Sequence, residues 1–173
     1  MRIFLIGYMG SGKTTLGERL SRAMSMDFVD LDQQIELREN RPIPEIFKAE
    51  GEAGFRGIEK RCLREVVTEM DEVVISTGGG TPCFYDNMSL MNQSGLTIYL
   101  RMDVPSLVFR LRNSDGSRPL ISGMSENELS AFVKQHLEER KEFYEECKIV
   151  VEGMGFSDKK LDELIDAIVN YSR

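Results

Sequence analysis

The residues best suited to chemistry stand near the start of the chain, in the segment Gly7–Thr14, which reads GYMGSGKT. It matches the pattern G-x-x-x-x-G-K-[ST] at every fixed position, and it follows the apolar run Ile3–Ile6. Glycines let the backbone N–H groups curl around phosphate oxygens, and the positive end of the next helix points at the same anion. Lys13 adds a charge near the β- and γ-phosphates, and the Thr14 hydroxyl can ligate Mg²⁺. The segment predicts binding of a nucleoside triphosphate.

Two carboxylates, Asp30 and Asp32, follow the short apolar pair Phe28-Val29. If the chain is still extended there, both carboxylates face the same way. Beside a phosphate-binding loop, one can hold Mg²⁺ and the other can orient or deprotonate an attacking hydroxyl. The alternative is that Asp32 is the N-cap of a helix beginning at Gln33. The spacing alone leaves both interpretations open.

An arginine, Arg56, follows the Gly-rich stretch Gly51–Gly54, with Glu59 three residues later. A guanidinium oriented by a carboxylate can clamp an acidic ligand through two hydrogen bonds. The same spacing also suits a surface ion pair on a helix, which contributes little. Taken alone, the pattern favours the surface pair.

A polar loop, Asn113–Pro119, lies between two helical patterns and contains Arg118. We interpret it as a mobile lid that brings Arg118 onto the transferring phosphate and excludes water, although a solvated connector has the same composition. Further along, Arg140 stands in a run of charged residues that is typical of an exposed helix face.

The elements that position these residues alternate along the chain. Apolar runs predict buried parallel strands, and helical patterns fall between them. The expected strands cover Ile3–Ile6, Phe28-Val29, Val73–Ile75, Leu96–Leu100 and Ile149–Val151, and the expected helices cover Thr14–Met24, Asp32–Glu39, Ala53–Met70, Val104–Arg112, Glu126–Glu145 and Ser157–Tyr171.

This alternation predicts an α/β fold, a parallel sheet with helices on both faces. Ligands bind beyond the carboxyl ends of the strands in such sheets. The glycine loop, the two aspartates and the triple glycine Gly78–Gly80 each follow a predicted strand. We therefore expect all three to open onto one crevice.

Composition narrows the class of protein. The chain has 173 residues and a formal net charge of −7, which suits one acidic domain and argues against general nucleic-acid binding. Its three cysteines show no C-x-x-C spacing, so we expect reduced thiols. No apolar run in the sequence reaches membrane-spanning length, and we expect a cytoplasmic protein that has no signal peptide and binds no membrane.

Taken in order, these segments resemble the shikimate kinase family from Ile3 to about Val151. The resemblance rests on the glycine loop, Phe28–Asp32, Ile46-Phe47, Gly51–Arg56 with Glu59, Gly78–Gly80, Arg118-Pro119-Leu120, and Arg140 with Tyr144. It implies a nucleoside monophosphate kinase-like sheet of five parallel strands. It also implies one domain over residues 1–173 with a lid at approximately 111–123.

The resemblance implies transfer of the ATP γ-phosphoryl group to the 3-hydroxyl of shikimate, on the route to chorismate and aromatic amino acids. Lys13, Asp32 and Arg118 would be catalytic, and Thr14 and Asp30 would hold Mg²⁺. The implied acceptor contacts are Asp32, Arg56, Gly78, Gly79, Gly80 and Arg140, and the implied nucleotide contacts are Gly10, Ser11, Gly12, Lys13, Thr14, Thr15, Arg110 and Arg118.

The chain departs from the family pattern in two places. Glu142 stands where the family usually has a proline, two residues after Arg140. On the adenine side, Arg110 and Arg112 are both candidates for one contact, and Met154–Phe156 lacks the arginine expected for another.

Two rival functions follow from the same motifs. One is a kinase for another small acceptor, such as gluconate or a nucleoside monophosphate, and the other is a nucleotide-binding regulatory module without transfer activity. The combination of Asp32 and Arg56 argues against the first, and the complete set of acceptor groups argues against the second. We take a monomer as the default state.

Overall fold

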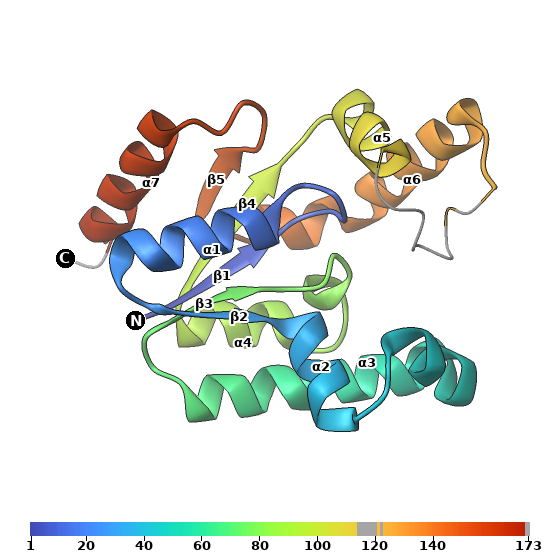
Figure 1. Ribbon diagram of the computed structural model, residues 1–173, viewed down its shortest axis with the longest axis horizontal. Helices are drawn as coiled ribbons and strands as arrows, with labels where there is room; N and C mark the ends of the chain where they lie inside the picture. Colours follow the sequence, from blue (N-terminus) through green and yellow to red (C-terminus); the bar gives the residue numbers. More distant parts are fainter. Residues whose placement is uncertain (114–120, 122, 172–173) are drawn as a thin grey trace.

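Figure 1 shows the protein as a computed structural model that describes residues 1–113, 121 and 123–171. Within these residues, five strands form one parallel sheet in the order β2-β3-β1-β4-β5. The strands are β1 (Arg2–Ile6), β2 (Asp27–Asp30), β3 (Val73–Ser76), β4 (Leu96–Arg101) and β5 (Ile149–Glu152). All five coincide with the predicted strands to within two residues at each end.

Alternation of side chains along the strands divides the core into two layers. In β1, Ile3 and Leu5 belong to one buried cluster, whereas Phe4 and Ile6 belong to another. The first cluster includes residues of α1 (Lys13–Met24) and α7 (Asp158–Tyr171), and the second includes residues of α2 (Leu31–Glu39), α3 (Ile43–Glu69) and α4 (Asn87–Ser94). Burial on both faces explains why these strands are almost wholly apolar.

The remaining helices, α5 (Val104–Arg112) and α6 (Glu126–Glu145), lie at the side of the molecule where the strands end (Figure 1). They pack around Tyr8, which follows β1 and is buried. Both begin at side-chain caps, Asp103 for α5 and Ser125 with Glu128 in a capping box for α6. A third buried cluster thus packs beside the glycine loop, at the end of the sheet where the sequence predicts the ligand site.

Part of the helical prediction was incomplete. The helix predicted from Ala53 begins ten residues earlier, at Ile43. It consists of two helical stretches that are joined by a kink at Gly51 (φ 70°, ψ −174°), and the sequence predicted only the second stretch. Helix α4 and the short 3₁₀ turn η1 (Thr81–Cys83) were not predicted. Helix α4 contains two Asn and two Ser residues, which are weak helix formers, and it buries Met88 and Met91 in the core.

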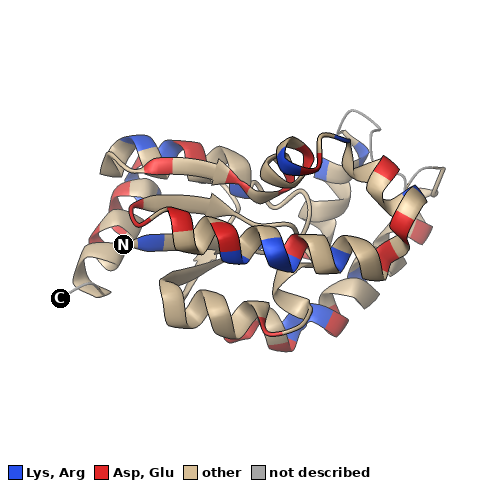
Figure 2. Ribbon diagram, turned by 90° about the horizontal axis from the view of Figure 1, so that it is seen from below, with Lys and Arg blue, Asp and Glu red and all other residues tan. Residues whose placement is uncertain are grey.

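Charged residues are concentrated on some helices: α3 and α6 carry many of both signs, whereas α4 carries none. Figure 2 shows basic and acidic residues interspersed along α3, the helix nearest the viewer. Among the described residues, no helix combines the length and the apolar character needed to span a membrane.

Candidate active site

The glycine loop connects β1 to α1 at the carboxyl end of the sheet. Gly7, Gly10 and Gly12 all have positive φ angles (141°, 80° and 100°), and a Cβ atom on Gly7 would lie 2.8 Å from the carbonyl oxygen of Leu100. Helix α1 has no side-chain cap and no acidic residue in its first turn. Its first N–H groups therefore remain available to an anionic ligand.

Lys13 lies under this loop and is almost completely buried. Its Nζ donates hydrogen bonds to the carbonyl oxygens of Gly7, at 2.8 Å, and Tyr8, at 2.9 Å. These bonds hold the ammonium at the loop, where it can meet a phosphate.

The structure distinguishes the two arginines proposed for the adenine side. Arg110 donates to the carbonyl oxygen of Ser11 at 2.9 Å and lies 3.5 Å from that of Gly153, so it spans the glycine loop and the segment after β5. Arg112 instead forms an ion pair with Glu126. The predicted lid arginine, Arg118, and most of the predicted lid lie outside the described residues.

The two aspartates have different surroundings. Helix α2 begins at Leu31, and its N-cap is Asp30, whose Oδ1 accepts hydrogen bonds from the backbone of Asp32 and Gln33. The alternative that made Asp32 the cap is wrong, and so is the assumption that the chain stays extended to Asp32. The other oxygen of Asp30 accepts a hydrogen bond from Thr14 Oγ1 at 2.9 Å.

Asp32 lies in the first turn of α2 and points toward the triple glycine. A Cβ atom on Gly78 would lie 3.1 Å from its Oδ1. Burial raises the pKa of the Asp32 carboxyl to about 6; the negative charges of Asp30 and Glu59 add to the rise, and Lys13 and Arg56 oppose it. A carboxylate with this pKa can accept a proton near neutral pH.

Arg56 is not the surface residue that its spacing favoured. Its Nη1 donates to Glu59 Oε2 at 3.0 Å, and the side chains of Arg56 and Glu59 are 11% and 0% exposed. The other oxygen of Glu59 accepts from Thr81 Oγ1 at 2.7 Å. The arginine is thus fixed in the interior, beside Gly80.

Arg140 also faces inward, because α6 presents it to the glycine loop. Its guanidinium carbon lies 5.4 Å from the ring centroid of Tyr8, and a Cβ atom on Gly79 would lie 3.6 Å from its Nη1. The interpretation of Arg140 as part of a solvated helix face is wrong. Glu142, where the family usually has a proline, is exposed, and α6 continues through it without interruption.

The triple glycine is where these groups meet. A Cβ atom on Gly78 would contact Asp32, one on Gly79 would contact Arg140, and one on Gly80 would lie 2.6 Å from Arg56 Nη2. Only glycine leaves room for all of these side chains beside one stretch of backbone. Two arginines and a carboxylate therefore converge next to the glycine loop.

Two neighbours of the site, Thr81 and Phe84, were missed from the sequence, and Tyr144 was named through the family resemblance without a role. Tyr144 donates from its hydroxyl to the carbonyl oxygen of Gly79 at 2.6 Å, Thr81 binds Glu59, and the ring of Phe84 lies against Arg56. Thr81 and Phe84 directly follow the triple glycine, and this adjacency was the available signal. The contact of Tyr144 depends on packing across 65 residues of chain.

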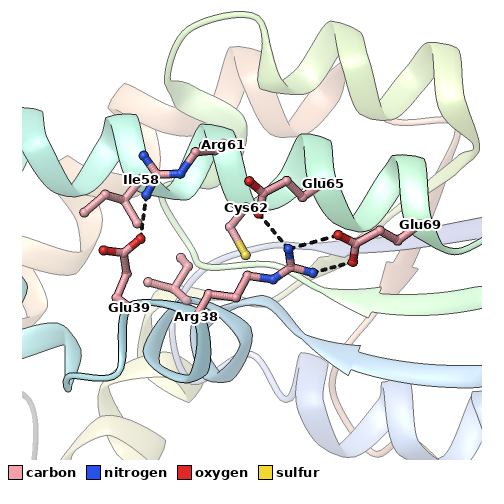
Figure 3. A pocket seen from close by; sticks show the side chains of 8 residues that line it. Arg38, Glu39, Ile58, Arg61, Cys62, Glu65 and Glu69 are labelled. Atoms are coloured by element: carbon pink, nitrogen blue, oxygen red, sulfur yellow. Dashed lines mark hydrogen bonds and ion pairs between the residues drawn. The ribbon is translucent and has the colours of Figure 1, made fainter.

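A pocket between α2 and α3 lies outside this site (Figure 3). Arg38 in this pocket pairs with Glu65 and Glu69, and Arg61 pairs with Glu39. Burial raises the pKa of the adjacent Cys62 thiol to about 11, so this cysteine remains protonated. These ion pairs join α2, whose first turn contains Asp32, to α3, which carries Arg56.

Comparison with known proteins identifies the family of this chain. The family model described as shikimate kinase matches residues 9–171. A shikimate kinase of Bacteroides fragilis is 48% identical over 150 residues, which cover 87% of this chain and 83% of the relative. One of Parabacteroides distasonis is 46% identical over 152 residues, covering 88% and 87% of the two chains.

Solved structures share the fold. Shikimate kinase from Bacteroides thetaiotaomicron superposes with a TM-score of 0.91 at 41% identity, covering 96% of this chain and 97% of its own. The enzyme from Acinetobacter baumannii in complex with shikimate gives 0.86 at 31% identity, covering 98% and 93%. A gluconokinase from Sinorhizobium meliloti, with a TM-score of 0.61 at 15% identity, shares the fold alone, covering 98% and 92%. The chain belongs to the shikimate kinase family.

Proposed function

We propose that this chain transfers the γ-phosphoryl group of ATP to the 3-hydroxyl of shikimate, using the residues that surround Gly78–Gly80. The observation that carries the assignment is the convergence of Asp32, Arg56 and Arg140 on this triple glycine, beside the glycine loop. Shikimate is a small carboxylate that bears hydroxyls. Two guanidiniums for its carboxylate and one carboxylate for its hydroxyls are the groups that it requires.

On the donor side, the glycine loop and the N-terminus of α1 receive the phosphates. Lys13 leaves the carbonyl oxygens of Gly7 and Tyr8 and neutralises charge on the β- and γ-phosphates. Arg110 lines the nucleotide site between Ser11 and Gly153. Arg118 completes the site from a lid at approximately 111–123 and stabilises charge on the transferring phosphoryl group.

On the acceptor side, Arg56 and Arg140 bind the carboxylate, and the backbone of Gly78–Gly80 lies against the ring. Asp32 orients the 3-hydroxyl and takes its proton as the phosphorus–oxygen bond forms. Catalysis in this arrangement rests on positioning and on charge stabilisation.

The oxygen ligands beside the loop fit Mg²⁺. Thr14 Oγ1 and Asp30 Oδ2 lie 2.9 Å apart, and Ser76 Oγ lies 3.5 Å from Thr14 Oγ1. The described residues contain no group of three His, Cys, Asp or Glu side chains that could cage a metal. This suits Mg²⁺, which is held by one or two protein oxygens together with phosphates and water. Thr14 and Asp30 would hold the ion, which would neutralise charge on the phosphates.

We place this activity in a single domain over residues 1–173, acting as a cytoplasmic monomer that binds neither nucleic acid nor membrane. The acidic charge of the chain supports the absence of nucleic-acid binding. Anionic substrates are then attracted by the local basic groups of the crevice.

The assignment is tested by ADP release from purified protein with Mg·ATP. Shikimate, gluconate, AMP and CMP are compared with no acceptor. We expect strong stimulation by shikimate alone. Stimulation by gluconate or a nucleotide instead would favour another small-molecule kinase. ATP binding with no stimulated turnover would favour a regulatory module.

A further inference from the structure

The guanidinium of Arg56 is held by an aromatic ring as well as by Glu59. Its central carbon lies 4.1 Å from the ring centroid of Phe84 and 5.2 Å from that of Phe55. A Cβ atom on Gly80 would lie 2.6–2.9 Å from three atoms of the guanidinium, so the group is also closely packed against this backbone.

The contact with the Phe84 ring leaves hydrogen-bond donors of Arg56 unused. A guanidinium has five N–H donors in one plane, and a ring face attracts the cation without accepting an in-plane hydrogen bond. Arg56 gives one donor to Glu59 at 3.0 Å and one to Glu52 at 3.4 Å, and its Nε has no hydrogen-bond partner among the described residues. A second buried carboxylate would have fixed the group equally well, but it would have competed with an acidic ligand.

Phe84 is itself held in place by contacts on both sides along the segment Thr81–Asp86. Thr81 binds Glu59 at one end, and Asp86 pairs with Lys60 at 2.9 Å and Arg64 at 2.5 Å at the other. All three partners, Glu59, Lys60 and Arg64, lie within six consecutive residues of α3.

The residue after Phe84 is strained. Tyr85 has a positive φ of 54°, and its ring lies 4.8 Å from Lys60 Nζ. A non-glycine residue keeps this conformation only where its surroundings enforce it. The position of the Phe84 ring is therefore fixed by the flanking contacts with α3.

We infer that Phe84 is a positioning residue for acceptor binding: its ring holds the Arg56 guanidinium so that the unused N–H donors meet the carboxylate of the acceptor. The inference rests on the proposed role of Arg56. It assigns Phe84 a role in the affinity for the acceptor and none in binding ATP or in the transfer step.

The test compares Phe84→Leu, Phe84→Tyr and Tyr85→Leu in the full chain, with Mg·ATP and shikimate. Leucine preserves apolar bulk but removes the π face, so we expect the KM for shikimate to rise about three- to tenfold. The kcat and the KM for ATP should stay within about twofold of the parent values.

Two variants serve as controls. Phe84→Tyr retains the π face and should keep the parent KM for shikimate. Tyr85→Leu removes the neighbouring ring, which faces Lys60 rather than Arg56, and should leave the KM for shikimate unchanged.

Several outcomes would overturn the inference. One is an unchanged KM for shikimate in Phe84→Leu; another is an equal rise in Tyr85→Leu, which would indicate general loosening of the segment. A fall in kcat with unchanged KM would also contradict it. Arg56→Ala separates the two proposals: if it raises the KM for shikimate while Phe84→Leu does not, only the role of Phe84 fails. If Arg56→Ala has no effect, the proposed carboxylate clamp fails first.

Discussion

Arg56 Nη1 lies 3.0 Å from Oε2 of Glu59, and Glu59 is completely buried. The second oxygen of Glu59 accepts from Thr81 at 2.7 Å. A single carboxylate therefore joins the arginine on α3 to the segment that follows the triple glycine. Because the pair is shielded from water, it cannot be treated as a weak surface ion pair.

Replacing Glu59 should affect stability and acceptor binding together. In Glu59→Ala, Arg56 remains buried without its main partner, and we expect a loss of about 3–5 kcal/mol in the free energy of unfolding. Glu59→Gln retains an acceptor oxygen and should lose about 1–2 kcal/mol, with a raised KM for shikimate. Urea unfolding and steady-state kinetics measure both effects. Glu52→Gln is the control for stability, because Glu52 is 63% exposed and pairs with Arg56 at 3.4 Å; a loss as large as in Glu59→Gln would contradict the argument.

The sequence predicted the parts of the site that depend on local geometry. The glycine loop is defined within eight consecutive residues, since its strand, turn and helix are all adjacent. The strand positions follow from short apolar runs that are buried on both faces. Site residues at the ends of these strands could therefore be assigned to one crevice before the structure was known.

The environments of Arg56 and Arg140 could not be predicted in this way. Each lies on a helix with charged neighbours, and the pattern favoured solvent exposure for both. Arg56 is buried and Arg140 is half-buried, because Gly80 and Gly79, far away in sequence, leave space for them. The role of Asp30 was also uncertain, because the boundary between β2 and α2 decides which aspartate caps the helix.

The pH dependence of the reaction should report the ionisation of Asp32. Burial and the charges of Asp30 and Glu59 raise its pKa to about 6. Since the ionised form is needed to accept the proton, kcat/KM for shikimate should rise tenfold per pH unit up to about pH 6 and then level off. Circular dichroism over the same range verifies that the protein stays folded. A flat profile between pH 5 and 8 would exclude Asp32 as the proton acceptor.

The same buried charge should reduce stability at neutral pH. A carboxyl whose pKa is raised on folding binds its proton more tightly in the folded state, so folding loses stability as pH rises from about 4 to about 6. Asp32→Asn removes this loss. The variant should therefore exceed the parent by up to about 3 kcal/mol above pH 6, and the difference should vanish near pH 4. Its turnover should fall by orders of magnitude.

Denaturant unfolding at pH 4, 5, 6 and 8 measures this difference. Asp162→Asn, at an exposed position of α7, removes the same formal charge and serves as the control. We expect it to change stability by less than about 0.5 kcal/mol. An Asp32→Asn variant no more stable than the parent at pH 8 would show that the ionised carboxylate carries no cost in the folded state.

The hydroxyl of Thr14 and the carboxylate of Asp30, 2.9 Å apart, should set the requirement for Mg²⁺. Thr14→Val preserves the shape of the side chain but removes the ligand oxygen, so the Mg²⁺ concentration for half-maximal activity should rise at least about tenfold. Asp30→Asn tests the role of the carboxylate in binding Mg²⁺ while leaving the stability of α2 unchanged, because asparagine caps helices as well as aspartate does. Asp30→Ala is less suitable, since it would also remove the cap of α2 at a cost of about 1 kcal/mol. Thr68→Val, at an exposed site on α3, is the matched control. If both site variants titrate with Mg²⁺ like the parent, the ion is held by the nucleotide alone.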